Sequence, residues 1–219
     1  MIVYGVEPGG VYVAAEESFA RRPEGKRGIY VNLTNQCTCA CIFCLRPLKS
    51  TAEEHSLWLA KEPTFEEARE AIEALQWPLV DEVVFCGFGE PTMRLEVLTS
   101  LLRWLREEHS EVRTRLNTNG LSDLYYGRDT APDFDGLLDT ISISLNASNA
   151  DRYLALTRSR FGIGSFDAML AFAEHAKAYV PDVVLTVVDH VEDDGEIARC
   201  KALCEARGLR LRVRPYEAS

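Results

Sequence analysis

Strand-like and helix-like segments alternate along almost the whole of this 219-residue chain. Short apolar segments that read as strands are followed by longer segments in which apolar residues recur at helical spacing. This alternation is typical of an α/β fold with a parallel sheet. The predicted strands are 28–34, 81–87, 112–118, 140–146, 182–189 and 209–215. The predicted helices are 64–75, 95–108, 149–157, 165–179 and 194–208.

Two of the predicted helices carry a start signal. Thr64 and Glu67 have the spacing of a capping box at the first residue of helix 64–75. Ser165 is expected to cap helix 165–179.

The length of the chain limits how the pattern can close. A complete barrel of eight such units needs roughly 250 residues, so this chain has room for about six, with an N-terminal hairpin over residues 2–14. We therefore expect a partial (βα)6 parallel barrel. No linker interrupts the pattern, which predicts a single domain over 1–219, with 1–27 as hairpin and extension and 28–215 as barrel core.

Several predicted strands alternate apolar and polar residues instead of being apolar throughout. In strand 140–146, for example, Ile141 and Ile143 alternate with Ser142 and Ser144. The apolar face must meet the helices, so the polar face is expected to line an open lumen that receives a ligand. The alternative is a sheet edge with one wet face, which is strongest for the last strand, with its RLRVR sequence.

Residues suited to binding stand at the ends of successive predicted strands. A cysteine cluster follows the first, GFGEPT (87–92) the second and Asn119 the third, while Asn146 ends the fourth and His190 follows the fifth. The carboxyl ends of parallel strands meet at one edge of the sheet, where such folds bind their ligands. The sequence therefore predicts an active site on this rim.

Charge and hydropathy exclude some functions. The net charge of −10 argues against an extended nucleic-acid footprint. The sequence has neither an apolar run that could span a membrane nor a signal segment, so a cytoplasmic protein is expected. Thiols stay reduced there, which disfavours disulfides.

Four of the seven cysteines fall within TNQCTCACIFC (34–44). Cys37, Cys41 and Cys44 form C-x3-C-x2-C, a dense spacing that favours an iron–sulfur cluster. Three thiolates would leave one iron of a 4Fe-4S cluster open to another ligand. Cys39 does not fit this spacing and is expected to point away and be dispensable. Zinc and purely structural thiols remain alternatives, but zinc usually takes four ligands from two separated pairs.

The cysteine triple, together with a G-x-G-E-P sequence after the second strand, resembles the radical S-adenosylmethionine (SAM) superfamily. The resemblance extends over most of the chain. Within the superfamily, the sequence is similar to the subfamily called TatD family-associated radical SAM proteins. The segments that carry this resemblance are YVNLTNQCTCACIFCLR, LWL, VVFCGFGEPT, LNTNG, SISLNA and LTVVD.

The resemblance implies a partial barrel of radical SAM type and two cofactors. One 4Fe-4S cluster would be ligated by Cys37, Cys41 and Cys44, and its fourth iron would bind SAM. The positions that match SAM contacts in the family are Phe43, Gly87, Gly89, Glu90, Pro91, Asn119, Ser144 and Asn146. Phe88 stands where many members have a second adjacent glycine.

The resemblance also implies the reaction. An electron from a flavodoxin- or ferredoxin-like donor would cleave SAM reductively, and the 5′-deoxyadenosyl radical would abstract hydrogen from a small or nucleotide-like anionic substrate. Two alternatives remain open: an activase that installs a radical on a protein partner, and a non-catalytic iron–sulfur or electron-transfer protein.

Candidate substrate residues are Arg214, His190 and Cys86. Arg214 could clamp an anion, or it could protect an edge strand. The position of His190 is more typical of a surface histidine, and Cys86 is more typical of a packed thiol than of a hydrogen donor to a substrate radical. Residues 46–63 either form a lid over the site or pack on the body through Leu57, Trp58 and Leu59.

Overall fold

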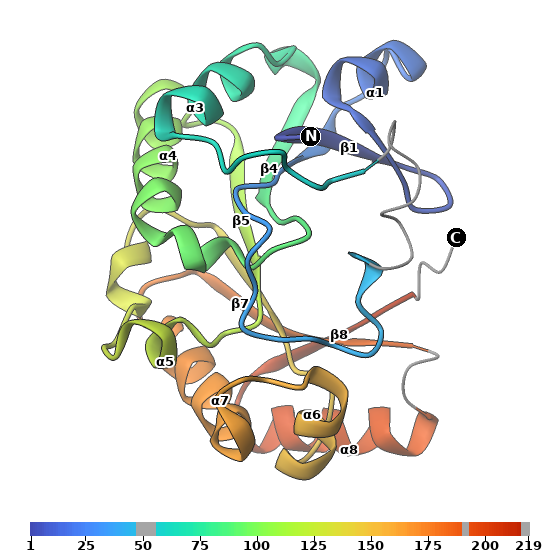
Figure 1. The fold of residues 1–219 in the computed structure, drawn as a ribbon, viewed down its shortest axis with the longest axis vertical. Helices are drawn as coiled ribbons and strands as arrows, with labels where there is room; N and C mark the ends of the chain where they lie inside the picture. The colour runs from blue at the N-terminus through green and yellow to red at the C-terminus, as the bar shows by residue number, and fades with distance from the viewer. Residues whose placement is uncertain (47–55, 190–192, 216–219) are drawn as a thin grey trace. The chain divides into compact units, whose positions relative to one another are not determined.

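The computed structural model of the protein describes residues 1–46, 56–189 and 193–215. The chain divides into two compact units (Figure 1). Among the described residues, the first contains 1–36, 45–46 and 56–116, and the second contains 37–44, 117–189 and 193–215. No helix within the described ranges is long and apolar enough to cross a membrane.

The first unit is built on strands in the order β2-β1-β3-β4-β5. β1 pairs antiparallel with β2 and β3, whereas β3 and β4, like β4 and β5, pair in parallel. The predicted N-terminal hairpin is therefore confirmed. The strands of this unit are β1 (Val3–Glu7), β2 (Val11–Ala14), β3 (Arg27–Val31), β4 (Val80–Phe85) and β5 (Arg113–Thr118), whose last two residues belong to the second unit. Its helices are α1 (Ala15–Arg21), α3 (Phe65–Glu73), η2 (Trp77–Leu79), η3 (Pro91–Arg94) and α4 (Leu95–Glu108).

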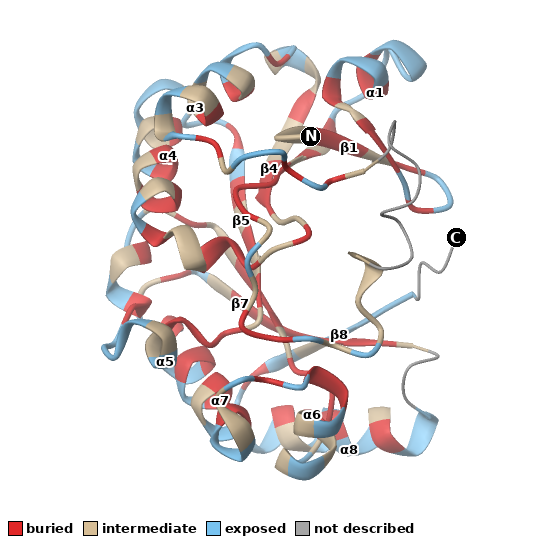
Figure 2. Cartoon of the chain, viewed as in Figure 1, coloured by how far each residue is buried: buried red, intermediate tan, exposed pale blue. Residues whose placement is uncertain are grey.

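The buried faces of this unit follow the expected periodicities. α4 buries Leu98, Leu101, Leu102 and Leu105, which lie on one helix face. Figure 2 shows the buried residues of α4 on one side of the helix and a mostly buried β4. α3 starts with the predicted capping box, because Thr64 accepts from the Glu67 amide while the Glu67 carboxylate accepts from the Thr64 amide.

The second unit contains the parallel strands β6-β7-β8 in that order. These are β6 (Thr140–Ser144), β7 (Asp182–Val188) and β8 (Arg210–Arg214). The helices are α5 (Ser122–Tyr126), η4 (Ala131–Phe134), α6 (Ala150–Thr157), η5 (Gly162–Gly164), α7 (Ser165–Ala176) and α8 (Asp194–Ala206). The alternation of parallel strands and helices confirms the predicted α/β class and is consistent with a partial barrel.

The structure of this unit tests two points of the sequence analysis, the capping role of Ser165 and the exposure of the last strand. Ser165 does not cap α7: it is the first helical residue, and its hydroxyl donates instead to Gly162 O at 2.6 Å. For the last strand, the alternative of a wet sheet edge fits better than a lumen-facing strand, since β8 pairs with β7 and is largely exposed (Figure 2). In the first unit, Arg115 on β5 pairs with Glu82 on β4 at 3.0 Å.

Candidate functional site

Residues 37–44, here called the cysteine loop, are docked on the C-terminal end of α6. The amides of Ala40 and Ile42 donate to Thr157 O and Leu156 O, both at 2.9 Å. The last carbonyls of a helix have no partner within the helix, so the loop supplies the missing donors. The loop also accepts a hydrogen bond, from Arg160 N to Thr38 O at 3.0 Å. The protein alone therefore fixes the path of the loop.

The four thiols of the loop differ in exposure. Cys37, Cys41 and Cys44 are half-buried, whereas Cys39 is buried. Only the three thiols of the predicted ligand set are thus accessible. Soft thiolates suit iron–sulfur clusters, and a cubic cluster binds each thiolate to a different iron. The donor chemistry of this loop fits such a cluster. Among the described residues, no three His, Cys, Asp or Glu side chains converge on a point that could hold a single metal ion.

Asn119 reaches the cysteine loop from the end of β5. Its Nδ2 donates to Thr38 Oγ1 at 3.0 Å and lies 3.9 Å from Cys37 Sγ. Its Oδ1 accepts from the Leu121 amide at 3.0 Å. The sequence predicted Asn119 as a SAM contact, and the structure places both polar atoms of its side chain in protein hydrogen bonds.

Ser144 is the last residue of β6, and Asn146 lies two residues beyond it. Asn146 is buried and has a left-handed backbone (φ 61°), which asparagine tolerates better than most residues. Its amide donates to Thr186 O at 3.3 Å. Two residues later, the Ser148 amide donates to Glu196 Oε1 at 2.6 Å, so α8 holds this turn in place.

Glu196 is the buried charge that supports the turn. It is 1% exposed and also accepts from Arg199 Nε at 2.8 Å. Burial alone would raise the pKa of Glu196, but the hydrogen bonds from Ser148 and Arg199 outweigh burial and lower it. Glu196 is therefore a carboxylate at neutral pH. The sequence analysis missed it because a glutamate in an exposed-looking helix carries no signal of burial.

In the first unit, the glycines of the GFGEPT segment are required by close backbone contacts. A Cβ on Gly89 would overlap Thr34 O and lie 2.6 Å from Gln36 O, and one on Gly87 would overlap the Asn32 side chain. Glu90 is buried and accepts from Thr92 Oγ1 at 2.8 Å. Gly87, Gly89 and Glu90 therefore form one closely packed turn that leads into Pro91, the first residue of η3.

Residues 56–63 are fastened to the end of β3 rather than standing free. Asn35 donates to Leu59 O at 2.7 Å and accepts from Leu59 N at 3.0 Å, while Asn32 Nδ2 donates to Leu57 O at 2.5 Å. Leu57 and Leu59 are buried and Trp58 is 52% exposed. Of the two alternatives for residues 46–63, a lid or packing on the body of the protein, residues 56–63 therefore show packing. Residues 47–55 lie outside the described residues.

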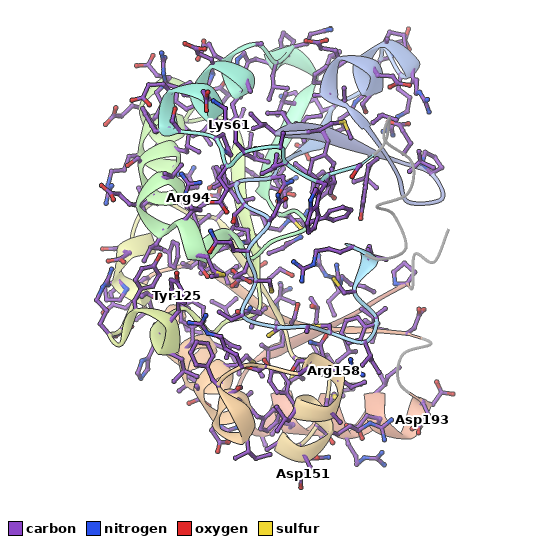
Figure 3. All side chains as sticks on the ribbon, viewed as in Figure 1. Lys61, Arg94, Tyr125, Asp151, Arg158 and Asp193 are labelled. Atoms are coloured by element: carbon purple, nitrogen blue, oxygen red, sulfur yellow. The ribbon has the colours of Figure 1, made fainter. Side chains whose placement is uncertain are left out.

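Glu62 ties the same segment to η3. It accepts from Thr34 Oγ1, from Gln36 Nε2 at 2.9 Å and from Arg94 Nη1 at 3.1 Å (Arg94 is labelled in Figure 3). Burial alone would raise the pKa of Glu62, but these donors lower it. The sequence offered no signal for this network, because its members are 28 and 32 residues away from Glu62.

The substrate candidates occupy different surroundings. Cys86 is half-buried, and its carbonyl accepts from the Tyr4 hydroxyl at 3.2 Å. Arg214 is exposed on β8, and His190 lies outside the described residues. Phe43 is half-buried on the cysteine loop.

Two polar groups outside the predicted set also matter for the candidate site. Thr38 and Asn117 were missed by the sequence analysis. Thr38 is the acceptor for Asn119, and Asn117 holds a buried Oδ1 with no hydrogen-bond partner among the described residues. Asn117 alternates with Leu116 on β5, which is the only sequence signal for it.

Cys200 and Cys204 are buried on α8, and burial raises the pKa of Cys204 to about 11, as expected for packed thiols.

A comparison with family profiles matches the profile of the Radical SAM superfamily to residues 31–204. Among curated proteins, the chain is 31% identical over 196 residues to GTP 3′,8-cyclase of Corynebacterium glutamicum (strain R), covering 85% of this chain and 48% of that protein. The chain thus spans about half the length of the curated relatives it matches.

Solved structures share the fold at low sequence identity. SuiB of Streptococcus suis, bound to its precursor peptide SuiA, matches with a TM-score of 0.65 and 16% identity, over 92% of this chain and 42% of SuiB. A radical SAM methyltransferase from Sphaerobacter thermophilus matches with a TM-score of 0.57 and 19% identity, over 87% of this chain and 66% of that one. These likenesses agree with the partial barrel predicted from the sequence.

Proposed function

The chain belongs to the radical SAM superfamily, and on that premise we propose that it is an enzyme that binds one 4Fe-4S cluster and cleaves SAM reductively. Membership of the superfamily implies both cofactors. The cluster, when bound, supplies one electron that splits a carbon–sulfur bond of SAM to give methionine and a 5′-deoxyadenosyl radical, which abstracts hydrogen from the substrate.

The observation that carries the proposal is the cysteine loop itself. Its backbone is held by the end of α6, and its three accessible thiols, on Cys37, Cys41 and Cys44, match the spacing of a cluster-binding motif. We propose these three as the iron ligands. Cys39 is buried and is left out of the ligand set.

The proposed SAM contacts are named here one unit at a time. Gly87, Gly89, Glu90 and Pro91 are the proposed contacts from the first unit, where the two glycines let this segment pack closely against Asn32, Thr34 and Gln36. From the second unit we propose Phe43 beside the adenine, and Ser144 and Asn146 for the ribose or carboxylate. Asn119, the remaining candidate, would act on the cofactors through the cysteine loop. The roles other than that of Asn119, which the resemblance places among the SAM contacts, follow the family resemblance residue by residue.

We further propose membership of the TatD family-associated subfamily, on the sequence segments that carry that resemblance. A small or nucleotide-like anionic substrate is the best-supported class, because the sequence relative is a GTP 3′,8-cyclase. Arg214, His190 and Cys86 stay the candidates for substrate contact. A single domain over residues 1–219, a cytoplasmic location and a flavodoxin- or ferredoxin-like electron donor complete the proposal.

The test is anaerobic reconstitution of the chain with iron and sulfide, followed by dithionite and SAM. We expect about four irons per chain, together with 5′-deoxyadenosine detected by mass spectrometry. Cys41→Ala should lose the cluster, whereas Cys204→Ala, which changes a buried thiol on α8, should load normally. Absence of 5′-deoxyadenosine from intact, cluster-loaded protein would overturn the proposal that the protein is an enzyme. Binding of zinc in place of iron would overturn the proposed 4Fe-4S cofactor.

The substrate class has its own experiment. Cluster-loaded protein is incubated with SAM, reductant and a panel of nucleotides, small carboxylates and peptides. A nucleotide that raises 5′-deoxyadenosine above the uncoupled background supports the proposed class. Stimulation by peptides alone would replace it with the protein-activating alternative.

A further inference from the structure

We propose that Asn119 is a positioning residue that donates a hydrogen bond to the sulfur of Cys37 and thereby raises the reduction potential of the cluster. This inference rests on the proposed function, because it requires that Cys37 is an iron ligand. It adds a role for Asn119 that differs from direct contact with SAM.

The orientation of the Asn119 amide follows from its hydrogen bonds. The Leu121 amide is a donor, so the atom of Asn119 that faces it at 3.0 Å must be the oxygen. The side-chain nitrogen then points toward the cysteine loop. Gly120 fixes the turn, since it has φ +73° and a Cβ there would lie 2.8 Å from the Ile143 side chain. The turn after β5 thus aims the Asn119 N–H groups at the loop.

The two hydrogens of Asn119 Nδ2 have identifiable acceptors. One meets the Thr38 hydroxyl oxygen at 3.0 Å. The other is shared by the sulfurs of Cys37 at 3.9 Å and Cys39 at 3.8 Å. Thr38 and Cys39 are buried, at 4% and 6% exposure, so water has little access to this hydrogen-bond group. Cys39, which is dispensable as an iron ligand, therefore shares the Asn119 donor with Cys37.

A donor beside a ligand sulfur has a defined electrostatic effect. Reduction adds negative charge to the cluster and its thiolates, and an N–H group directed at a thiolate sulfur stabilises that charge. Loss of the donor should therefore make the cluster harder to reduce. A residue that only held the fold would not be expected to change the potential in an ordered way.

The test compares the midpoint potential of the reconstituted cluster in wild type, Asn119→Ala and Asn119→Asp, by a titration followed by electron paramagnetic resonance. Asn119→Asp keeps the acceptor for Leu121 and loses the donor, so it also serves where Asn119→Ala fails to fold. We expect the potential to be highest in wild type, lower in Asn119→Ala and lowest in Asn119→Asp, where a carboxylate faces the thiolates.

Asn149→Asp is the matched control. Asn149 is exposed at the start of α6 in the same unit, and aspartate serves equally well at that helix start, so this variant should keep the wild-type potential. Equal potentials in all four fully loaded proteins would overturn the inference and leave the proposed function standing. A wild-type protein that binds no cluster would instead overturn the proposed function, and the inference with it.

Discussion

The backbone amide of Glu90 donates a 2.7 Å hydrogen bond to the carbonyl of Gln36, the residue directly before the cysteine loop. Gly89 sits against the same carbonyl. Within the first unit, the GFGEPT segment and the residue that precedes the cysteine loop are thus joined by main-chain contacts. Because those contacts involve backbone on both sides, neither partner can move aside easily.

Gly89→Ala should therefore destabilise the protein by about 1–3 kcal/mol, the usual cost of forcing atoms into a packed site. The added methyl would overlap Thr34 O and crowd Gln36 O. Chemical unfolding of the apo-protein measures the effect, and SAM binding should fall with it. Gly164→Ala is the control, since a Cβ there meets nothing within 4 Å. Equal stabilities of the two variants would contradict this account.

Cys39→Ala should retain the cluster, whereas Cys37→Ala should lose it. Cys39 is buried, and the three other thiols of the loop are accessible. Deleting one buried sulfur should cost about 1 kcal/mol of stability. Iron and sulfide analysis after reconstitution decides the matter, and loss of iron from Cys39→Ala would place that residue among the ligands.

Asn35→Ala should release residues 56–63 from the end of β3. The Asn35 side chain makes both hydrogen bonds to the Leu59 backbone. Their loss should cost about 1–2 kcal/mol locally and speed hydrogen exchange of the Leu59 amide by roughly tenfold. Asn35→Asp, which keeps the acceptor for this amide, should protect it better. Unchanged exchange in Asn35→Ala would mean that buried Leu57 and Leu59 hold the segment alone.

Glu196→Gln should lower stability at pH 7 by about 1–3 kcal/mol, because a buried charge-assisted network is weakened. The pKa of Glu196 is lowered in the folded protein from an ordinary value of 4.5. Its contribution is therefore present above pH 4.5 and is lost as the pH falls through the folded value. Urea unfolding at several pH values should show a smaller acid loss in the variant than in wild type. Parallel pH profiles would refute this role.

The elements that the sequence predicted well are those set by local patterns. α4 spans Leu95–Glu108, the predicted range, because its apolar spacing is regular and continuous. The capping box of Thr64 and Glu67 needs only residues three apart. α1 and α5 were missed because helices of seven and five residues are too short to establish a periodicity.

In the candidate site, too, the sequence predicts the features that depend on local motifs and misses those that depend on contacts between distant residues. The cysteine triple and the glycine turn are motifs, and sequence reasoning found them. The contact between Asn119 and Thr38 joins residues 81 positions apart, and no local pattern encodes it. Ser165 was wrongly predicted as a cap, because its hydroxyl bonds to Gly162 and Ser159, residues that the sequence does not mark as its neighbours.

The docking of the cysteine loop on α6 limits which lengths this loop can have. The amides of Ala40 and Ile42 meet two consecutive carbonyls at the end of the helix. An insertion between Ala40 and Ile42 would put these amides out of step with those carbonyls, even if every cysteine were kept. The spacing around Cys41, one of the proposed ligands, is therefore constrained by a helix more than a hundred residues further along the chain.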